Sequence, residues 1–169
     1  MSTRTQSGAQ AGTQSNAMAA GQDAIALLTA DHREVAEMFE QFEQLGDRAT
    51  TSKEKLKDKI CKALIAHTTI EEEIFYPAVR AANVEEGEDM VDEAIVEHAA
   101  AKDLIKQLQE MQPDDELYDA KVKVLSEQIE HHVKEEEKEM FPKAKKAGLD
   151  LLALGQEMAL RKQELMSTL

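Results

Sequence analysis

The chain has 169 residues, and its 34 acidic and 20 basic side chains give a formal net charge of −14. This charge, without any dense cluster of Lys and Arg, argues against nucleic acid as a partner, because phosphates attract basic surfaces. Seven glycines, three prolines and an aromatic content of 4% favour long helices over a strand-rich fold. The length suits one all-α domain.

The first 20 residues, the short apolar stretches and the single cysteine suggest a cellular location. Residues 1–20 are polar and of low complexity, so they predict a disordered tail and lack the apolar core of a secretory signal. Apolar stretches elsewhere are short and interrupted by charge, so no membrane span is expected. Cys61 cannot form an internal disulfide, which favours a reducing cytoplasm.

Two helices are predicted in the first half of the domain. A short apolar turn capped by Asp23 precedes a helix that Thr29 caps and that runs to about Gly46. A capping box of Thr51 and Glu54 begins a second helix, which runs to about Ala82. Spacings of three and four residues define their inward stripes: His32, Val35, Ala36, Phe39 and Phe42 on the first, and Leu56, Ile60, Leu64, His67, Glu71, Ile74, Phe75 and Ala78 on the second.

Two further helices repeat this pattern. The third spans about 87–112 and ends at Pro113, and Asp114 caps a fourth that runs to about Ala147. Their inward stripes are Val91, Ala94, Ile95, His98, Ala101, Ile105 and Leu108, then Leu117, Tyr118, Val122, Leu125, Ile129, His132, Glu136 and Met140. Gly148 stops the bundle of about 22–147, and a fifth amphipathic helix, about 149–167, packs across it.

The spacing places four histidines at one level. With a rise of about 1.5 Å per residue, His32 and His67 both lie on the order of 21 Å from the turn between their helices. His98 and His132 likewise lie at similar distances on either side of the helix break at Pro113. His32 to His98 is 66 residues and His67 to His132 is 65, so the second hairpin reads as a duplicate of the first. The sequence therefore predicts a pseudo-twofold site with one half from each hairpin.

A glutamate on the inward stripe, four residues after the second histidine of each hairpin, points to metal binding. One histidine on an apolar face is more often a hydrogen-bonded core residue, but a carboxylate is almost never buried unless it is paired or binds a metal. An ordinary i,i+4 pair contributes only a few tenths of a kcal/mol, too little to offset burial of Glu71 and Glu136. Imidazole with carboxylate suits Fe, Mn, Zn or Cu. A metal-free bundle, or one held by zinc, is the plainer alternative.

Other candidate residues are assigned structural roles. Tyr118 lies too far along its helix from His132 to bind a shared metal. Tyr76 follows Phe75 and is expected mainly to pack, although it could line an entrance. His131 points about 100° away from His132 toward solvent. Cys61 follows the inward-facing Ile60, has no second cysteine nearby and is predicted to be a structural residue.

The chain closely resembles the hemerythrin-like family of HHE cation-binding domains. The matching motifs, over about residues 22–147, are "DH" at 31–32, "HTTIEEEIFYP" at 67–77, "EH" at 97–98 and "HVKEEEKEMFP" at 132–142. The resemblance implies an antiparallel up-down four-helix bundle around two non-haem iron ions with an oxo or hydroxo bridge, iron being favoured over Mn or Zn. It implies the ligands His32, His67, Glu71, His98, His132 and Glu136.

Two departures from the oxygen-carrying members bear on function. Those members have a further histidine where this chain has Lys102, and their last motif is HxxxxD, with Glu137 here at the Asp position. Four histidines and two glutamates favour catalase-like chemistry on peroxide or O2, in defence against oxidative or nitrosative stress. The alternatives are an iron, O2 or NO sensor without turnover, and iron–sulfur cluster repair. The small-molecule ligand is the only partner predicted.

Overall fold

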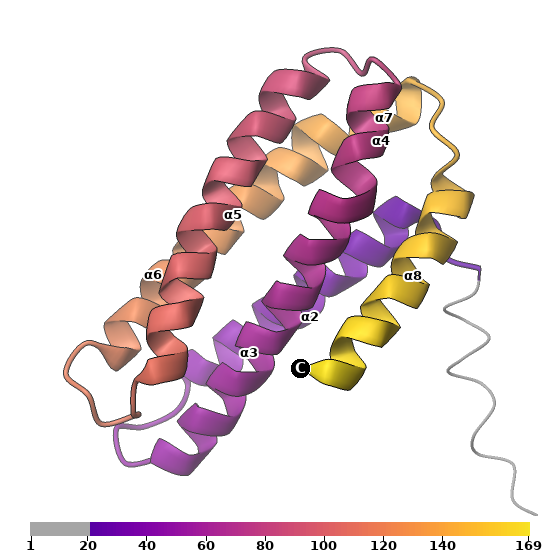
Figure 1. Ribbon diagram of the computed structural model, residues 1–169. Coiled ribbons are helices and arrows are strands. Elements are labelled where there is room, and N and C mark those ends of the chain that lie inside the picture. Colours follow the sequence, from indigo (N-terminus) through magenta and orange to yellow (C-terminus); the bar gives the residue numbers. More distant parts are fainter. Residues whose placement is uncertain (1–20) are drawn as a thin grey trace, which may run out of the picture.

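The computed structural model describes residues 21–169, and all regular structure in that range is helical (Figure 1). The predicted disordered tail, residues 1–20, lies outside the described residues. The elements are α2 (Ala24–Glu43), α3 (Thr50–Ile70), η1 (Glu71–Phe75), α4 (Tyr76–Ala81), α5 (Gly87–Glu110), α6 (Tyr118–Glu135), η2 (Glu136–Met140), α7 (Phe141–Lys146) and α8 (Leu151–Thr168).

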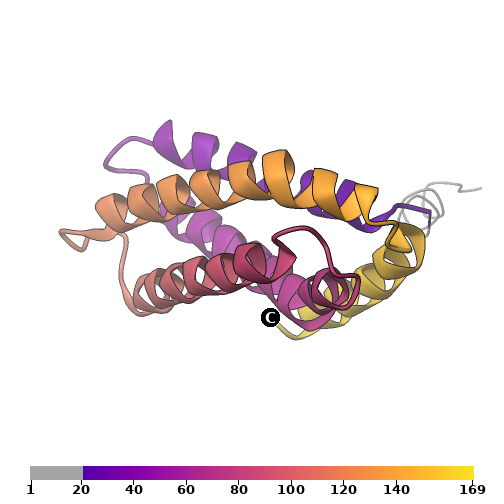
Figure 2. The same cartoon turned by 90° about the horizontal axis from the view of Figure 1, so that it is seen from above.

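Four long helical rods form the bundle. These are α2, the continuous α3–η1–α4, α5, and the continuous α6–η2–α7, which run alternately up and down (Figures 1 and 2). Helix α2 packs against α3, and α5 packs against α6. The predicted all-α fold class, a four-helix bundle with an additional C-terminal helix, is confirmed. None of the helices in residues 21–169 is both long and apolar enough to cross a bilayer.

The first helix begins earlier than the sequence predicts. Asp23 accepts a hydrogen bond from the Ala26 N–H at 2.8 Å and caps α2 directly. The apolar turn and the predicted helix are therefore one helix, and Thr29 lies inside it. The prediction of a second cap at Thr29 is wrong because the cap at Asp23 already satisfies the first turn.

Two other predicted caps are also wrong. Helix α3 begins at Thr50 without a side-chain cap, so Thr51 and Glu54 form no capping box. Helix α6 begins at Tyr118, and Asp114 does not cap it. Instead, Asp115 accepts a hydrogen bond from the Gln112 N–H at 2.8 Å and closes a turn before the helix. Loop side chains that satisfy nearby backbone donors compete with helix caps in this way.

The apolar interior is divided by the level of the histidines. Along α2, buried Leu28 belongs to one cluster and buried Val35 to the other, and His32 lies between them. His67, His98 and His132 occupy the same intermediate place on their helices. Three predicted inward residues, Ala36, Ile95 and Leu117, are exposed instead. They lie at the edges of stripes narrower than the sequence suggests, and Leu117 precedes its helix.

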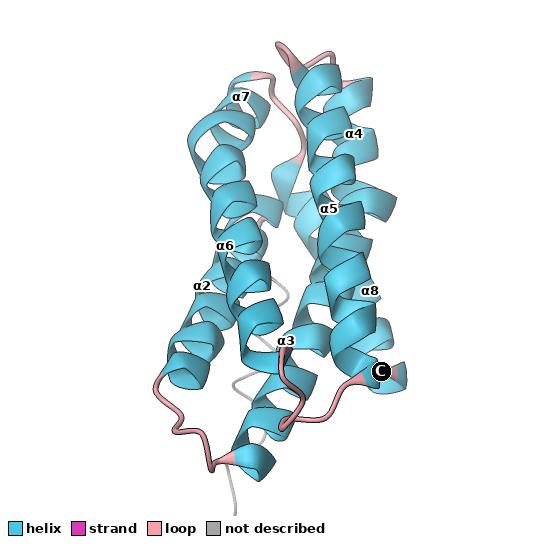
Figure 3. Ribbon diagram, turned by 90° about the vertical axis from the view of Figure 1, so that its left-hand side faces the viewer, coloured by secondary structure: helices cyan, strands magenta, loops and turns pink. Residues whose placement is uncertain are grey.

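Helix α8 packs along α2 and α3 on the outside of the bundle (Figures 1 and 3). Gly155 permits this contact, because a Cβ atom at that position would lie 2.3 Å from the backbone oxygen of Gln22. Met158, one turn later, is fully buried. The C-terminal helix is thus held tightly against the start of the bundle.

Each rod that carries a buried glutamate widens for one turn immediately after it. The backbone N–H of Tyr76 donates to the backbone carbonyl oxygen of Glu71, and that of Phe141 donates to the backbone carbonyl oxygen of Glu136. Both hydrogen bonds span five residues. Pro77 and Pro142 follow directly and lack the N–H that a regular α-helix needs. Such π-helical turns concentrate at functional sites. The sequence predicted uninterrupted helices here, so these two turns are a correction.

Candidate metal centre

The four predicted histidines meet in two pairs. The Nε2 atoms of His32 and His67 lie 3.2 Å apart, and those of His98 and His132 lie 3.1 Å apart. Each pair comes from one hairpin, α2 with α3 and α5 with α6. All four side chains are buried. The duplicated spacing in the sequence therefore corresponds to one histidine pair on each hairpin.

Two glutamates connect the pairs. The Glu71 Oε1 atom lies 3.2 Å from His67 Nε2, and its Oε2 atom lies 3.3 Å from His98 Nε2. The Glu136 Oε2 atom lies 3.3 Å from His32 Nε2 and 3.6 Å from His132 Nε2. Each carboxylate thus reaches a histidine of both hairpins, which is the position that a carboxylate shared by two cations requires.

Three of the four oxygens of these carboxylates receive no hydrogen bond from the described residues. Glu71 is fully buried and Glu136 is 1% exposed. Neither oxygen of Glu71, nor Oε2 of Glu136, receives a hydrogen bond. A buried carboxylate without donors is costly, so the arrangement calls for a positive partner. Four imidazole nitrogens and two carboxylates are a donor set that suits a divalent transition metal.

The ligating atoms divide into two groups that could each hold an ion. One group is His32, His67, Glu71 and Glu136, and the other is Glu71, His98 and His132. Within each group the atoms lie within 4.8 Å of one another. Glu71 belongs to both groups, so the residues fit two cations held side by side.

The charges of the site are coupled. Burial of His67 favours its neutral form, but the nearby carboxylates of Glu71 and Asp31 outweigh this and raise its pKa to about 10. Burial likewise opposes ionisation of Glu71, yet His67 and His98 bring the pKa of its carboxyl well below the usual value. The proton on His67 therefore balances the carboxylate of Glu71 until a cation replaces it.

Four acidic residues outside the site hold the imidazole rings. Each histidine has its Nδ1 atom beside one carboxylate, so its Nε2 atom points inward. The distances are 2.9 Å for His32 to Glu137, 3.3 Å for His67 to Asp31, 2.9 Å for His98 to Glu72 and 2.8 Å for His132 to Glu97. Glu137, at the Asp position of the oxygen carriers' motif, thus faces the outer side of a histidine.

These outer carboxylates were not among the predicted site residues, although the duplicated motifs contain a signal for them. Asp31 and Glu97 each precede a histidine, and Glu72 and Glu137 each follow one of the two buried glutamates. Lysines support two of them: Lys162 Nζ lies 2.5 Å from Asp31, and Lys102 Nζ lies 2.6 Å from Glu72. Lys102, where oxygen carriers have a histidine, therefore supports the site from outside.

Tyr76 takes part in the site, which the sequence analysis did not expect. Its hydroxyl donates a hydrogen bond to Glu136 Oε1 at 2.8 Å and lies 3.3 Å from His98 Nε2. Burial and the surrounding carboxylates raise the pKa of the phenol well above its ordinary value, so it stays protonated. The matching position of the second motif is Phe141, whose ring stacks on His32 with centroids 5.9 Å apart.

The remaining sequence candidates lie outside the site. Tyr118 is buried in the apolar cluster with Phe42. His131 faces solvent, with 63% of its side chain exposed. Cys61 is buried, and burial raises the pKa of its thiol to about 11.

Comparison with known proteins places the chain in a family. The model of the hemerythrin HHE cation binding domain matches residues 23–144. A DNA nickase from Nostoc sp. strain PCC 7120 is 30% identical over 114 residues, which are 66% of this chain and 30% of that protein. This chain therefore spans less than a third of that relative's length.

A solved structure shares the fold. The crystal structure of a hemerythrin HHE cation binding domain-containing protein from Mycobacterium kansasii superposes with a TM-score of 0.74 at 22% identity. The match covers 87% of this chain and 89% of that one. With the family model spanning most of the domain and the fold shared, the chain belongs to the hemerythrin HHE cation-binding domain family.

Proposed function

We propose that this protein is a non-haem di-iron protein that reacts with peroxide or O2 in a catalase-like manner and protects against oxidative or nitrosative stress. The observation that carries the proposal is the pair of buried carboxylates, Glu71 and Glu136, each placed between the two histidine pairs. Three of their four oxygens receive no hydrogen bond from residues 21–169.

The donor set favours iron with room for a small ligand. Nitrogen and oxygen donors in a four-helix bundle are the known setting of carboxylate-bridged iron pairs. Four histidines and two bridging glutamates provide roughly eight of about twelve bonds for two six-coordinate ions. When bound, the irons would supply two-electron redox chemistry, which peroxide decomposition requires.

The chain's own residues prepare the site for such a reaction. The outer carboxylates fix the imidazole rings, so the ligand atoms need little rearrangement. The Tyr76 hydroxyl, 2.8 Å from Glu136, places a protonated donor beside the shared carboxylate. Apolar clusters on both sides of the histidine level limit the entry of water. These features favour turnover at a defined centre over loose surface binding of metal.

Metal content and peroxide turnover test the proposal. Protein purified without a metal-binding tag should contain close to two irons per chain, and Glu71→Gln should contain far less. The iron-loaded protein should release O2 from peroxide faster than the same concentration of free iron. Absence of any transition metal, or O2 release no faster than free iron, would refute it.

A sensing function is the second candidate, supported by the attachment of α8. Lys162 of this helix contacts Asp31, which in turn contacts His67. A change of charge at the centre would therefore alter the contact between Asp31 and Lys162 of α8. Metal-dependent protection of α8 from proteolysis, lost in Lys162→Met, would support this alternative, and equal protection in both proteins would exclude it.

Nucleic acid is not part of the proposal. The name of the Nostoc relative describes a protein more than three times as long as the matched part. The net charge of −14 on this chain opposes binding to a phosphate backbone. We place the protein in the cytoplasm because its one cysteine is a free, buried thiol.

A further inference from the structure

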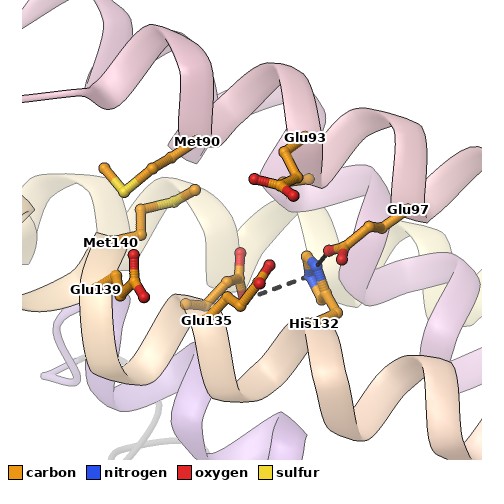
Figure 4. A pocket seen from close by; sticks show the side chains of 9 residues that line it. Met90, Glu93, Glu97, His132, Glu135, Glu139 and Met140 are labelled. Carbon is orange, nitrogen blue, oxygen red and sulfur yellow. Dashed lines mark hydrogen bonds and ion pairs between the residues drawn. The ribbon is translucent and has the colours of Figure 1, made fainter.

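An acidic pocket connects the surface to the candidate metal centre. A cavity of about 40 Å³ lies between α5 on one side and α6 with η2 on the other (Figure 4). Its outer lining is four glutamates and two methionines: Glu93, Glu97, Glu135, Glu139, Met90 and Met140. No Lys or Arg of the described residues lines it. The pocket therefore attracts cations and repels anions.

The inner end of the pocket reaches two residues of the centre, His132 and Glu136. Glu136 is 1% exposed, and its Oε2 atom receives no hydrogen bond from the described residues. A buried carboxylate oxygen that receives no hydrogen bond from the described residues thus lies at the end of an acidic pocket. A cation that enters the pocket meets an open ligand of the centre directly.

Two glutamates of the pocket lining, Glu97 and Glu135, come together with the neighbouring His131 as a second potential cation site. The Nε2 atom of His131 lies 3.2 Å from Glu135 Oε1 and 3.5 Å from Glu97 Oε1. The three ligating atoms lie within 4.8 Å of one another. An ordinary i,i+4 pair would account for His131 with Glu135, but Glu97 comes from a different helix. One imidazole and two carboxylates suit a divalent transition metal.

Glu97 links this outer group to the inner one. Its Oε1 atom faces His131, while its Oε2 atom lies 2.8 Å from His132 Nδ1. Glu97 Oε1 and Glu135 Oε1 both lie beside His131, so a cation there would be attracted by two carboxylates. One acidic side chain therefore contacts both the surface group and a histidine of the centre.

We propose that Glu97, His131 and Glu135 form an outer cation site that captures a divalent transition metal at the acidic pocket and passes it to the buried centre. The transfer is a ligand exchange without redox change: the cation leaves His131 and Glu135 and moves along the pocket to His132 and Glu136. This inference rests on the proposed function only in that the centre binds two metal ions, and it does not depend on peroxide chemistry.

Binding of Co²⁺ to the metal-free full chain tests the proposal. We expect about three Co²⁺ per chain at saturation, and about two for His131→Ala, whose exposed side chain can be removed without loss of core packing. The appearance of the Co²⁺ absorption of the buried centre should be about tenfold slower in His131→Ala and in Glu135→Gln. Glu127→Gln is the matched control, because it removes the same charge from an exposed site on α6 outside the pocket.

Two results would overturn the proposal. One is a Co²⁺ stoichiometry that His131→Ala leaves unchanged, and the other is an unchanged loading rate in both variants. Failure of the proposed centre gives a different pattern, because the chain would then bind one Co²⁺ that depends on His131 and is insensitive to Glu71→Gln. The outer site and the buried centre are thereby judged separately.

Discussion

Replacing Glu71 with Gln should uncouple metal binding from stability. Glu71 is fully buried and reaches His67 with one oxygen and His98 with the other. Gln has the same shape but only one oxygen and no charge, so it can serve one histidine pair at most, and Glu136 remains the single carboxylate beside both pairs. The variant should fold normally without metal and gain little from it.

The magnitude follows from binding linkage and the size of the domain. A metal present at a hundred times its Kd stabilises the folded state by about 2.7 kcal/mol per site. Unfolding residues 21–169, with roughly 2.1 cal/mol/K per residue, gives an entropy of about 0.31 kcal/mol/K, so each site raises Tm by about 9 °C. Because Glu71 is shared, its replacement should remove most of a combined shift of about 17 °C.

The metal-free variant should change much less. Glu71 receives no hydrogen bond from residues 21–169 that the substitution could remove, and the Gln amide can donate to a neutral imidazole. We expect the metal-free stabilities to agree within about 2 kcal/mol, since removal of a buried charge offsets imperfect pairing of the amide. Thermal unfolding followed by circular dichroism, with and without metal, measures both quantities.

An exposed acid provides the control. Glu110→Gln, at the end of α5, makes the same chemical change on the surface and should keep the full metal-dependent shift. If Glu71→Gln gained as much Tm from metal as Glu110→Gln, the carboxylate would not be a ligand, and the assignment of a shared bridge would be abandoned.

Three further predictions concern the surroundings of the site. Tyr76→Phe removes a hydrogen bond to buried Glu136 and should cost about 1.5–3 kcal/mol in urea unfolding; an unchanged midpoint would contradict it. Gly155→Ala should destabilise the protein by about 1–3 kcal/mol, because the added Cβ atom meets the backbone of Gln22. Gly46→Ala, which adds a Cβ atom in open space, should be neutral, and equal effects of the two substitutions would refute the packing argument. Cys61, with a pKa of about 11, should react with iodoacetamide about a hundredfold more slowly than the unfolded thiol at about pH 8, and faster as pH rises toward 11; equal rates would disprove its burial.

The sequence predicted the inner residues of the site because their chemistry is unusual for a core. Glu71 and Glu136 interrupt apolar stripes, and the repeat distance places His32, His67, His98 and His132 at one level. The four-helix fold follows from the same periodicity. These signals lie within each helix, so they can be recognised without knowing how the helices pack.

The outer residues could not be recognised in the same way. Glu72 and Glu137 look like ordinary solvent-facing acids, and only the packing of the two hairpins turns each toward a histidine of the other hairpin. The wide turns after Glu71 and Glu136 depend on backbone hydrogen bonds that a regular helical projection does not contain. Tyr76 enters the site through that wider turn, so a straight helix misplaces it.

Duplication explains the likeness of the two halves, and its exceptions distinguish the two positions that cations would occupy. Tyr76 lies against His98 and donates to Glu136, whereas its counterpart Phe141 stacks on His32 and has no hydroxyl. A small ligand arriving between the histidine pairs would meet a hydrogen-bond donor on one side and an apolar ring on the other. Tyr76→Phe should make the two sides chemically alike, so the substitution tests the asymmetry as well as the hydrogen bond.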